Sequence, residues 1–360
     1  MAALNTQLLN GFQYLYGQDL FFTKEVMRTC ERTLERAQFE EILPPIVVAY
    51  SSIVGETDRP VAPAQADIVF GVQSSGGERL ALSYENTLPA CLFFVENFAD
   101  SPPWVARRFY YISPHFRNER AAGIDQARRL RQFTQVGFEI IGGESGDTLP
   151  VAIGTGSALL SDLGLNHSIG LSEVTLLSRI LKRLGLEAAE RSTLRDLFDR
   201  RDTLAFEAFL ARSPLGAKQR ALLARLFSSQ RATPEELGEL RAWLWDNDLE
   251  DALASLERIE EVLSSLAPGI RRLASIDLSM VRSARLYTGI IYQYHFEGSE
   301  GSECGGGGEY NRVIQSLGGP DTKACGAAFG LERIVHEYKA STANNRVVAQ
   351  AAMPGAAPGR

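Results

Sequence analysis

The chain has 360 residues, of which 45% are hydrophobic and 22% charged, and its formal net charge is −7. This composition is that of a globular protein with one large or two smaller domains, and the acidic balance offers no global attraction for nucleic acid. Four cysteines and four histidines show no metal-ligand spacing, so we expect no metal site and a reducing compartment. The N-terminus lacks a signal-peptide pattern and no run of about 20 apolar residues occurs, which predicts a cytoplasmic protein with no membrane partner.

The first 170 residues predict a helix followed by a sheet. Apolar residues recur at helical spacing over 23–39, and residues 41–50 read as a strand entered through two prolines. The stretches 78–88, 107–118 and 131–143 alternate as strands do. Because the polar segment between the last two strands suits a hairpin loop, we predict an antiparallel sheet, followed by a helix and a short strand over 150–170.

The pattern changes to helices between residues 171 and 266, which we interpret as a helical insertion. One predicted helix covers 171–185 and ends at Gly185, and another begins with Thr233 as N-cap, Pro234 in the first turn and Glu236 closing a capping box. Strands return over 267–340, with a strand turning into a helix at 324–340, so residues 1–170 and 267–340 form the predicted core. The tail from Ser341 to the last residue is small and polar, which predicts disorder.

Two features have ordinary explanations. The glycine run at 305–308 matches no phosphate-loop motif, so we interpret it as a mobile loop or as a close approach of backbone to a ligand. His115 has no evident acid or base partner in the sequence, and we assign it no catalytic role.

Polar residues intrude on the predicted strands. Arg131, Phe133, Gln135 and Glu139 share one face of an otherwise apolar strand, which alone fits a structural ion-pair ladder or a solvent-facing surface as well as a site. Similar intrusions recur elsewhere, and they are Glu85 with Thr87 on one strand face, Arg117 with Glu119, Arg282 with Tyr287, and Arg333. Carboxylates, amides and hydroxyls suit an ammonium group, while arginines suit a carboxylate or phosphates, so this set predicts an amino-acid pocket beside a nucleotide.

In their order, five segments resemble the catalytic core of class II aminoacyl-tRNA synthetases, and specifically the histidyl branch. They are the helix before "EILPPIV", "FRNER" with "RRLRQFTQVGFEIIG", "VRSARLYTGIIYQ", "GGGGEYNRVIQSLGG" and "GAAFGLERIV". The resemblance covers about residues 8–340. It implies an α+β fold in which helices flank a class II synthetase-like antiparallel sheet, and a homodimer core.

The resemblance also implies a role for each polar residue. Arg117 and Arg333 would contact nucleotide phosphates, Phe133 would stack on adenine, and Glu119 lies in the same motif. The amino acid's ammonium would meet Glu85, Thr87 and Gln135, while Glu139 and Tyr287 would read an imidazole with Tyr310 nearby. Arg282 would lie between the amino acid carboxylate and the α-phosphate, so Arg117, Arg282 and Arg333 would be the catalytic residues of an enzyme.

The sequence departs from the histidyl pattern in two motifs. Where the family usually has R-G-L-D-Y-Y-T-G, Arg285 replaces the acid and Leu286 the first tyrosine. Where it usually has G-G-R-Y-D-G, Glu309 replaces the arginine and Asn311 the aspartate. These changes flank the predicted side-chain pocket and affect the expected specificity for histidine.

A histidyl-tRNA synthetase continues into an anticodon-binding domain after its third motif, whereas a short tail follows His336 here, so we expect no charging of tRNA. This outline and the insertion resemble the regulatory subunit of ATP phosphoribosyltransferase. That resemblance implies a non-catalytic, histidine-binding protein that needs no cofactor and activates the short catalytic subunit within a hetero-oligomer. The alternative is a freestanding enzyme that adenylates an amino acid with ATP and Mg²⁺ for a non-tRNA acceptor.

Overall fold

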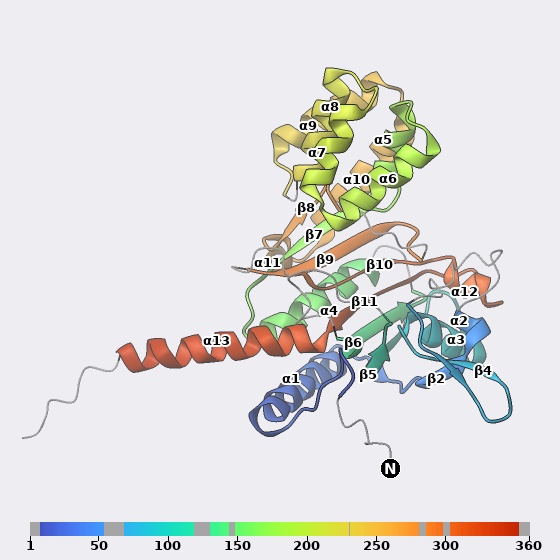
Figure 1. The fold of residues 1–360 in the computed structure, drawn as a ribbon, viewed down its shortest axis with the longest axis vertical. Helices are drawn as coiled ribbons and strands as arrows, with labels where there is room; N and C mark the ends of the chain where they lie inside the picture. The colour runs from blue at the N-terminus through green and yellow to red at the C-terminus, as the bar shows by residue number, and fades with distance from the viewer. Residues whose placement is uncertain are drawn as a thin grey trace, which may run out of the picture.

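The structure is a computed structural model that describes residues 8–53, 68–118, 130–143, 148–229, 231–280, 286–297 and 303–352. Its centre is an eight-stranded sheet (Figure 1). In spatial order the strands are β1 (Glu40–Glu41), β5 (Arg107–Phe116), β6 (Gln132–Ile141), β11 (Ala324–Gly330), β10 (Glu303–Glu309), β9 (Ile290–Phe296), β7 (His167–Glu173) and β8 (Ala274–Ile276). Only the edge strands β1 and β8 pair in parallel, so the predicted antiparallel sheet is confirmed.

The hairpin of β5 and β6 divides the sheet into two chemically different faces. Val136, Phe138 and Ile140 are buried on one face, where they join the main hydrophobic core. The alternate residues Phe133, Gln135 and Glu139 lie on the other face, because side chains alternate along a strand. This second face carries the predicted site.

Helices α1 (Gly17–Arg36), α4 (Thr148–Asp162) and α13 (Leu331–Ala352) cover the apolar face (Figure 1). Helix α13 lies beside α1 and continues as helix through Ala352, beyond Ser341 where the sequence predicts disorder. Tyr338 packs edge-on against Phe22, and Lys339 pairs with Asp19. These contacts hold α13 against α1 just before Ser341. The small residues that follow include several alanines, which favour a helix once it has begun.

The other face of the sheet is covered by α3 (Thr87–Phe98) and α12 (Val313–Ser316), which share a second core with Phe109, Ile141 and Tyr310. Beside them lies a small antiparallel sheet of β2 (Val47–Ala49), β4 (Arg79–Leu82) and β3 (Gly71–Gln73), with α2 (Tyr50–Ile53) following β2. Among the described residues no helix is long and apolar enough to cross a membrane.

Between β7 and β8 the chain forms a lobe of helices that stands at the top of Figure 1. They are α5 (Leu176–Arg183), α6 (Ala188–Arg200), α7 (Thr203–Arg212), α8 (Ala217–Ser228), α9 (Pro234–Asp246) and α10 (Glu250–Ser265), and the short α11 (Pro268–Arg271) precedes β8. The capping box of α9 is confirmed, since Thr233 Oγ1 accepts from Glu236 N and Glu236 accepts from Thr233 N. The predicted helix over 171–185 begins later, because residues 171–173 pair with β9 as the end of β7.

The glycine run at 305–308 is a buried part of β10, a strand between β9 and β11, and not a mobile loop. Aromatic rings take the space that side chains would occupy there. A Cβ on Gly305 would collide with the Phe329 ring, and one on Gly308 would lie 2.8 Å from Cδ1 of Tyr287. Glycine is required here because neighbouring rings and backbone lie directly against the strand.

Candidate functional site

The site centres on Glu139, whose side chain is 1% exposed on the face opposite the main core. Tyr111 on β5 donates its hydroxyl to Glu139 Oε1 at 3.1 Å, and Tyr310, which follows β10, donates to Oε2. The hydroxyl of Thr87 is a third donor to this carboxylate. We call Glu85, Thr87, Tyr111, Gln135, Glu139, Tyr287 and Tyr310 the Glu139 site.

Glu85 and Thr87 reach the site from the start of a helix and not, as predicted, from one face of a strand. Strand β4 ends at Leu82, and Thr87 is the first residue of α3. Both carboxylate oxygens of Glu85 accept from Leu88 N, at 3.3 and 3.2 Å, which satisfies a free N–H of the first helical turn. Asn86 fixes this turn to the sheet by donating to the Ser113 hydroxyl on β5 at 2.6 Å.

The two carboxylates oppose each other's ionisation. Burial raises the pKa of Glu139 to about 8, and the negative charge of Glu85 adds to this rise. Burial also raises the pKa of Glu85, although the backbone N–H groups at the start of α3 and the charge of Arg117 act against it. A ligand that brings positive charge and N–H donors would offset this cost of burying charge, because it supplies hydrogen bonds and a counter-charge in place of water.

Glycines make the floor of this site. A Cβ on Gly137 would collide with the Tyr111 ring, and one on Gly326 would collide with the carboxylate of Glu139. The Tyr287 ring lies over Gly308, which pairs directly with Gly326 on the neighbouring strand. The carboxylate and the tyrosine ring therefore lie side by side over adjacent glycines.

Toward the other end of β6 lies the predicted nucleotide-binding part. Phe133 stacks with His115 at a centroid distance of 5.8 Å, and the guanidinium carbon of Arg117 lies 5.0 Å from the centre of the Phe133 ring. Arg117 Nε donates to the Tyr84 carbonyl at 3.2 Å, next to Glu85. The fold thus brings Arg117 and Phe133 together, and it holds Arg117 against Tyr84, the residue that precedes Glu85.

His115 is fully buried and its Nδ1 lies 2.9 Å from the Ser113 carbonyl, which assigns the proton to Nδ1. Its Nε2 has no hydrogen-bond partner among the residues that the structure describes. Burial lowers the pKa of His115 to about 4, so the ring is neutral near pH 7 and is not a ready general acid.

The remaining predicted residues differ in how they are placed. Gln135 is half-buried and pairs across the sheet with Ser113 and Gly330, and Arg333 is exposed at the start of α13, where Nη1 donates to the Glu303 carbonyl at 2.6 Å. Glu119, Arg282 and Arg285 lie outside the described residues. Arg131 bonds to Asn118 and lies 4.6 Å over the Phe70 ring, beside the site rather than within it.

Sequence reasoning missed Tyr111, although the signal for it was present. Tyr111, Ser113 and His115 alternate along β5, and the register of the hairpin places Tyr111 opposite Gly137, two residues from Glu139.

A separate cavity of about 300 Å³ lies between α6 and α7, lined in part by Leu197 and Phe209. None of the predicted site residues that the structure describes lines it.

The family model described as histidyl-tRNA synthetase matches residues 11–334. This chain belongs to the histidyl-tRNA synthetase family. The histidine–tRNA ligase of Methanocaldococcus jannaschii is 26% identical over 303 residues, which covers 84% of this chain and 68% of that protein. The histidine–tRNA ligase of Streptococcus pneumoniae is 28% identical over 333 residues, covering 90% and 68%.

Solved structures of the same family share the fold. The ATP phosphoribosyltransferase regulatory subunit/histidyl-tRNA synthetase of Bacillus halodurans superposes with a TM-score of 0.77 at 17% identity and covers 93% of this chain and 84% of that one. The histidine–tRNA ligase subunit of Alicyclobacillus acidocaldarius superposes with a TM-score of 0.77 at 22% identity, covering 95% and 100%. The predicted class II synthetase-like fold is confirmed.

Proposed function

We propose that this chain binds histidine at the Glu139 site and acts as a regulatory subunit of ATP phosphoribosyltransferase. The observation that carries the proposal is the buried carboxylate of Glu139, set among hydroxyl donors, together with the half-buried carboxylate of Glu85 beside it. The α-ammonium of histidine would lie toward Glu85, Thr87 and Gln135. Its imidazole N–H would donate to Glu139 between Tyr287 and Tyr310.

Histidine fits this site better than an apolar amino acid for a physical reason. A buried carboxylate that gains an N–H donor recovers part of its lost hydration, and hydrogen bonds to charged groups contribute about 1.5–3 kcal/mol. An aliphatic side chain would leave Glu139 with only its hydroxyl donors. The site therefore favours a ligand with an ammonium at one end and an N–H donor at the other.

A regulatory role requires that histidine bind two states of an assembly with different affinity. Two observations support this role. One superposing structure is named as an ATP phosphoribosyltransferase regulatory subunit/histidyl-tRNA synthetase. The helical lobe, through Arg258, contacts the strand end next to Tyr310, so the site is joined to a second body that a partner could move.

The second candidate is amino-acid adenylation for a non-tRNA acceptor, with ATP and Mg²⁺. Arg117 over the Phe133 ring favours it, because this pair would hold an adenine ring and a phosphate close to the amino acid. In that reaction the carboxylate of the amino acid attacks the α-phosphorus of ATP, the aminoacyl adenylate forms and pyrophosphate leaves.

The two candidates are separated by two assays on one preparation. In the first, amino-acid-dependent ATP–pyrophosphate exchange is measured across the standard amino acids, with histidine first. In the second, the chain is mixed with a short ATP phosphoribosyltransferase catalytic subunit, and its activity is followed with and without histidine. The regulatory proposal predicts no exchange, activation by the chain, and reversal of that activation by histidine. Robust exchange with one amino acid and no activation would overturn it in favour of the enzyme.

A further inference from the structure

Glu309 is a second buried carboxylate, and it lies on the face of the sheet opposite Glu139. It pairs in register with Cys325, whose neighbour Gly326 pairs with Glu139, so the two carboxylates alternate across the sheet. Glu309 is 6% exposed, and its Oε2 accepts from Ile290 N at 2.8 Å. A Cβ on Gly289 would collide with this carboxylate, so the chain at 289–290 lies directly against Glu309.

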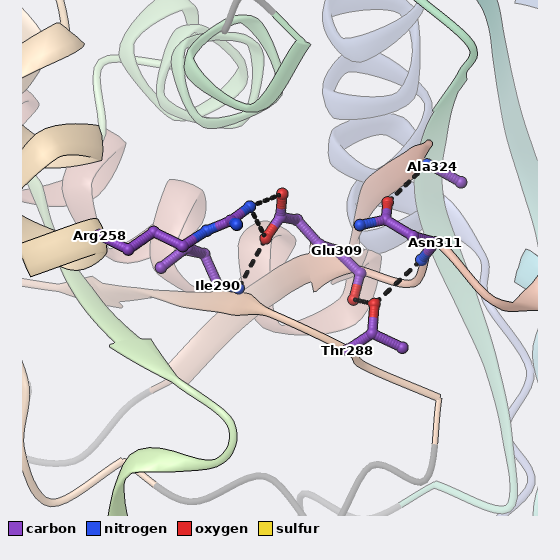
Figure 2. Close-up of polar contacts among 6 residues, drawn as sticks. All are labelled: Arg258, Thr288, Ile290, Glu309, Asn311 and Ala324. Atoms are coloured by element: carbon purple, nitrogen blue, oxygen red, sulfur yellow. Dashed lines mark hydrogen bonds and ion pairs between the residues drawn. The ribbon is translucent and has the colours of Figure 1, made fainter. Parts of the chain in front are cut away.

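The cation for Glu309 comes from the helical lobe. Arg258 on α10 donates from Nη2 to both carboxylate oxygens, at 2.7 and 2.9 Å (Figure 2). The Arg258 side chain is half-exposed and the Glu309 side chain is buried. This ion pair therefore lies at the edge of the interface between α10 and the sheet. Because an ion pair with one buried member depends on its partner remaining in place, the position of α10 and the position of the Glu309 carboxylate are coupled.

The same strand end holds the segment that carries Tyr287. Thr288 N donates to the Glu309 carbonyl at 2.7 Å, and Asn311 N donates to the Thr288 hydroxyl at 3.1 Å. Asn311 Oδ1 in turn accepts from Ala324 N at 3.0 Å on β11 (Figure 2). Residues 288 and 290, on either side of Gly289, are thus fixed by Glu309, and the Tyr287 ring is the next side chain along.

We propose that Glu309 is a positioning residue for the Glu139 site, and that Arg258 is its partner in the helical lobe. Glu309 fixes residues 288–290 and thereby the place of the Tyr287 ring over Gly308, next to Glu139. Arg258 makes this arrangement depend on the docking of α10. The part of the inference that concerns histidine rests on the proposed function, whereas the fixing of residues 288–290 does not.

By linkage, a site whose geometry depends on α10 must also influence α10 when it is filled. A partner that moves the helical lobe would change histidine affinity, and histidine would bias the lobe by the same free energy. Two members of this connection, Glu309 and Asn311, are positions at which the chain departs from the histidyl pattern that it resembles.

The test is a double-mutant cycle with Glu309→Gln, Arg258→Met and their combination, together with Arg258→Lys as the conservative variant. The matched control is Arg241→Met, because Arg241 pairs with Glu260 at 2.6 Å wholly within the helical lobe. Two readouts are taken on each folded protein. They are the dissociation constant for histidine by calorimetry and the hydrogen-exchange rate of the peptide covering residues 286–291 without ligand.

We expect Glu309→Gln and Arg258→Met each to weaken histidine binding roughly 2- to 30-fold and to speed exchange in 286–291. The double variant should be no weaker than the worse single variant, Arg258→Lys should recover most of the affinity, and Arg241→Met should match the wild type. Unchanged affinity and exchange in Arg258→Met overturn the inference. If the wild type binds no histidine, the proposed function fails, and the exchange rates alone decide whether Glu309 and Arg258 fix this segment.

Discussion

Glu139 and Glu309 are buried carboxylates on opposite faces of one sheet, and their surroundings differ in kind. Glu309 has a guanidinium and a backbone N–H within 3 Å, so its charge is compensated inside the chain. Glu139 receives hydroxyl donors, lies near a second carboxylate, and has its pKa raised to about 8 by burial. Removing one partner of a compensated buried carboxylate destabilises the fold, whereas an uncompensated carboxylate is itself kept at a cost in stability, which is typical of a ligand-binding group.

The largest loss of stability is expected for a change at Gly326, the glycine beneath Glu139. In Gly326→Ala the new Cβ would collide with the Glu139 carboxylate and with the Phe138 carbonyl, both of which are held in place. We expect a loss of at least about 3 kcal/mol in the free energy of unfolding, because overpacking against backbone cannot relax easily. Urea denaturation measures it.

The matched control for that variant is Gly154→Ala on helix α4, where the added Cβ meets nothing within 4 Å. There we expect equal or slightly higher stability, by up to about 1 kcal/mol, since alanine is the better helix former. Equal losses in both variants would show that the packing around Gly326 is not special.

The next effect separates the two carboxylates directly. Glu309→Leu removes the acceptor for the buried Ile290 N–H and the partner of Arg258, and we expect it to lower the free energy of unfolding by about 1–3 kcal/mol. Glu139→Gln keeps the shape but removes a charge that burial disfavours, so at pH 8 it should be neutral or stabilising. Denaturation of both variants at pH 8 tests this, and a larger loss in Glu139→Gln would contradict the contrast.

The pH dependence sharpens the comparison further. The pKa of Glu139 is raised from 4.5 in its ordinary state to about 8 in the folded protein, so the folded chain retains a proton that the unfolded chain loses. The stability from this group is therefore fully present below about pH 4.5 and is lost as the pH rises to about 8. Glu139→Gln should flatten the fall in melting temperature over this window, without abolishing it because the pKa of Glu85 is raised in the same direction. An unchanged slope would contradict a buried, protonated Glu139.

The smallest effect is expected at a single hydroxyl. Tyr111→Phe removes one donor to Glu139 Oε1 and should raise the pKa of Glu139 further, at a cost of about 1 kcal/mol or less. The midpoint of the pH-dependent loss of stability should then move above that of the wild type. A shift of this midpoint to lower pH would show that Tyr111 does not support the charged form.

Sequence alone predicts that Phe133, Gln135 and Glu139 share one face of the hairpin, because alternate residues of a strand lie on the same face whatever its partner strand. It placed Glu85 and Thr87 on a strand, because the alternation of "ALSYENTL" is local, whereas the start of α3 depends on Asn86 bonding to Ser113 across 27 positions. The capping box at Thr233 was predictable because all its parts are within four residues.

Two other features could not be found from the sequence for related reasons. The glycine run predicts a mobile loop or a close approach of backbone to a ligand, because glycine has little preference for strands, whereas the rings and backbone packed against it explain why it forms β10. The Arg258–Glu309 pair joins positions 51 residues apart, and no local pattern specifies how α10 docks on the sheet. Local periodicity in the sequence does not predict contacts between elements that are far apart in the chain.

The central claim is that Glu139 is left uncompensated so that it can bind histidine. The most direct test is calorimetric titration of histidine into the wild type and into Glu139→Gln at pH 7. The account predicts saturable binding of one histidine per chain, and affinity at least about tenfold weaker in the variant, because histidine displaces the proton of Glu139 and then donates to a charged carboxylate that glutamine cannot offer. Equal affinity in the two proteins, or no binding to the wild type, would contradict it.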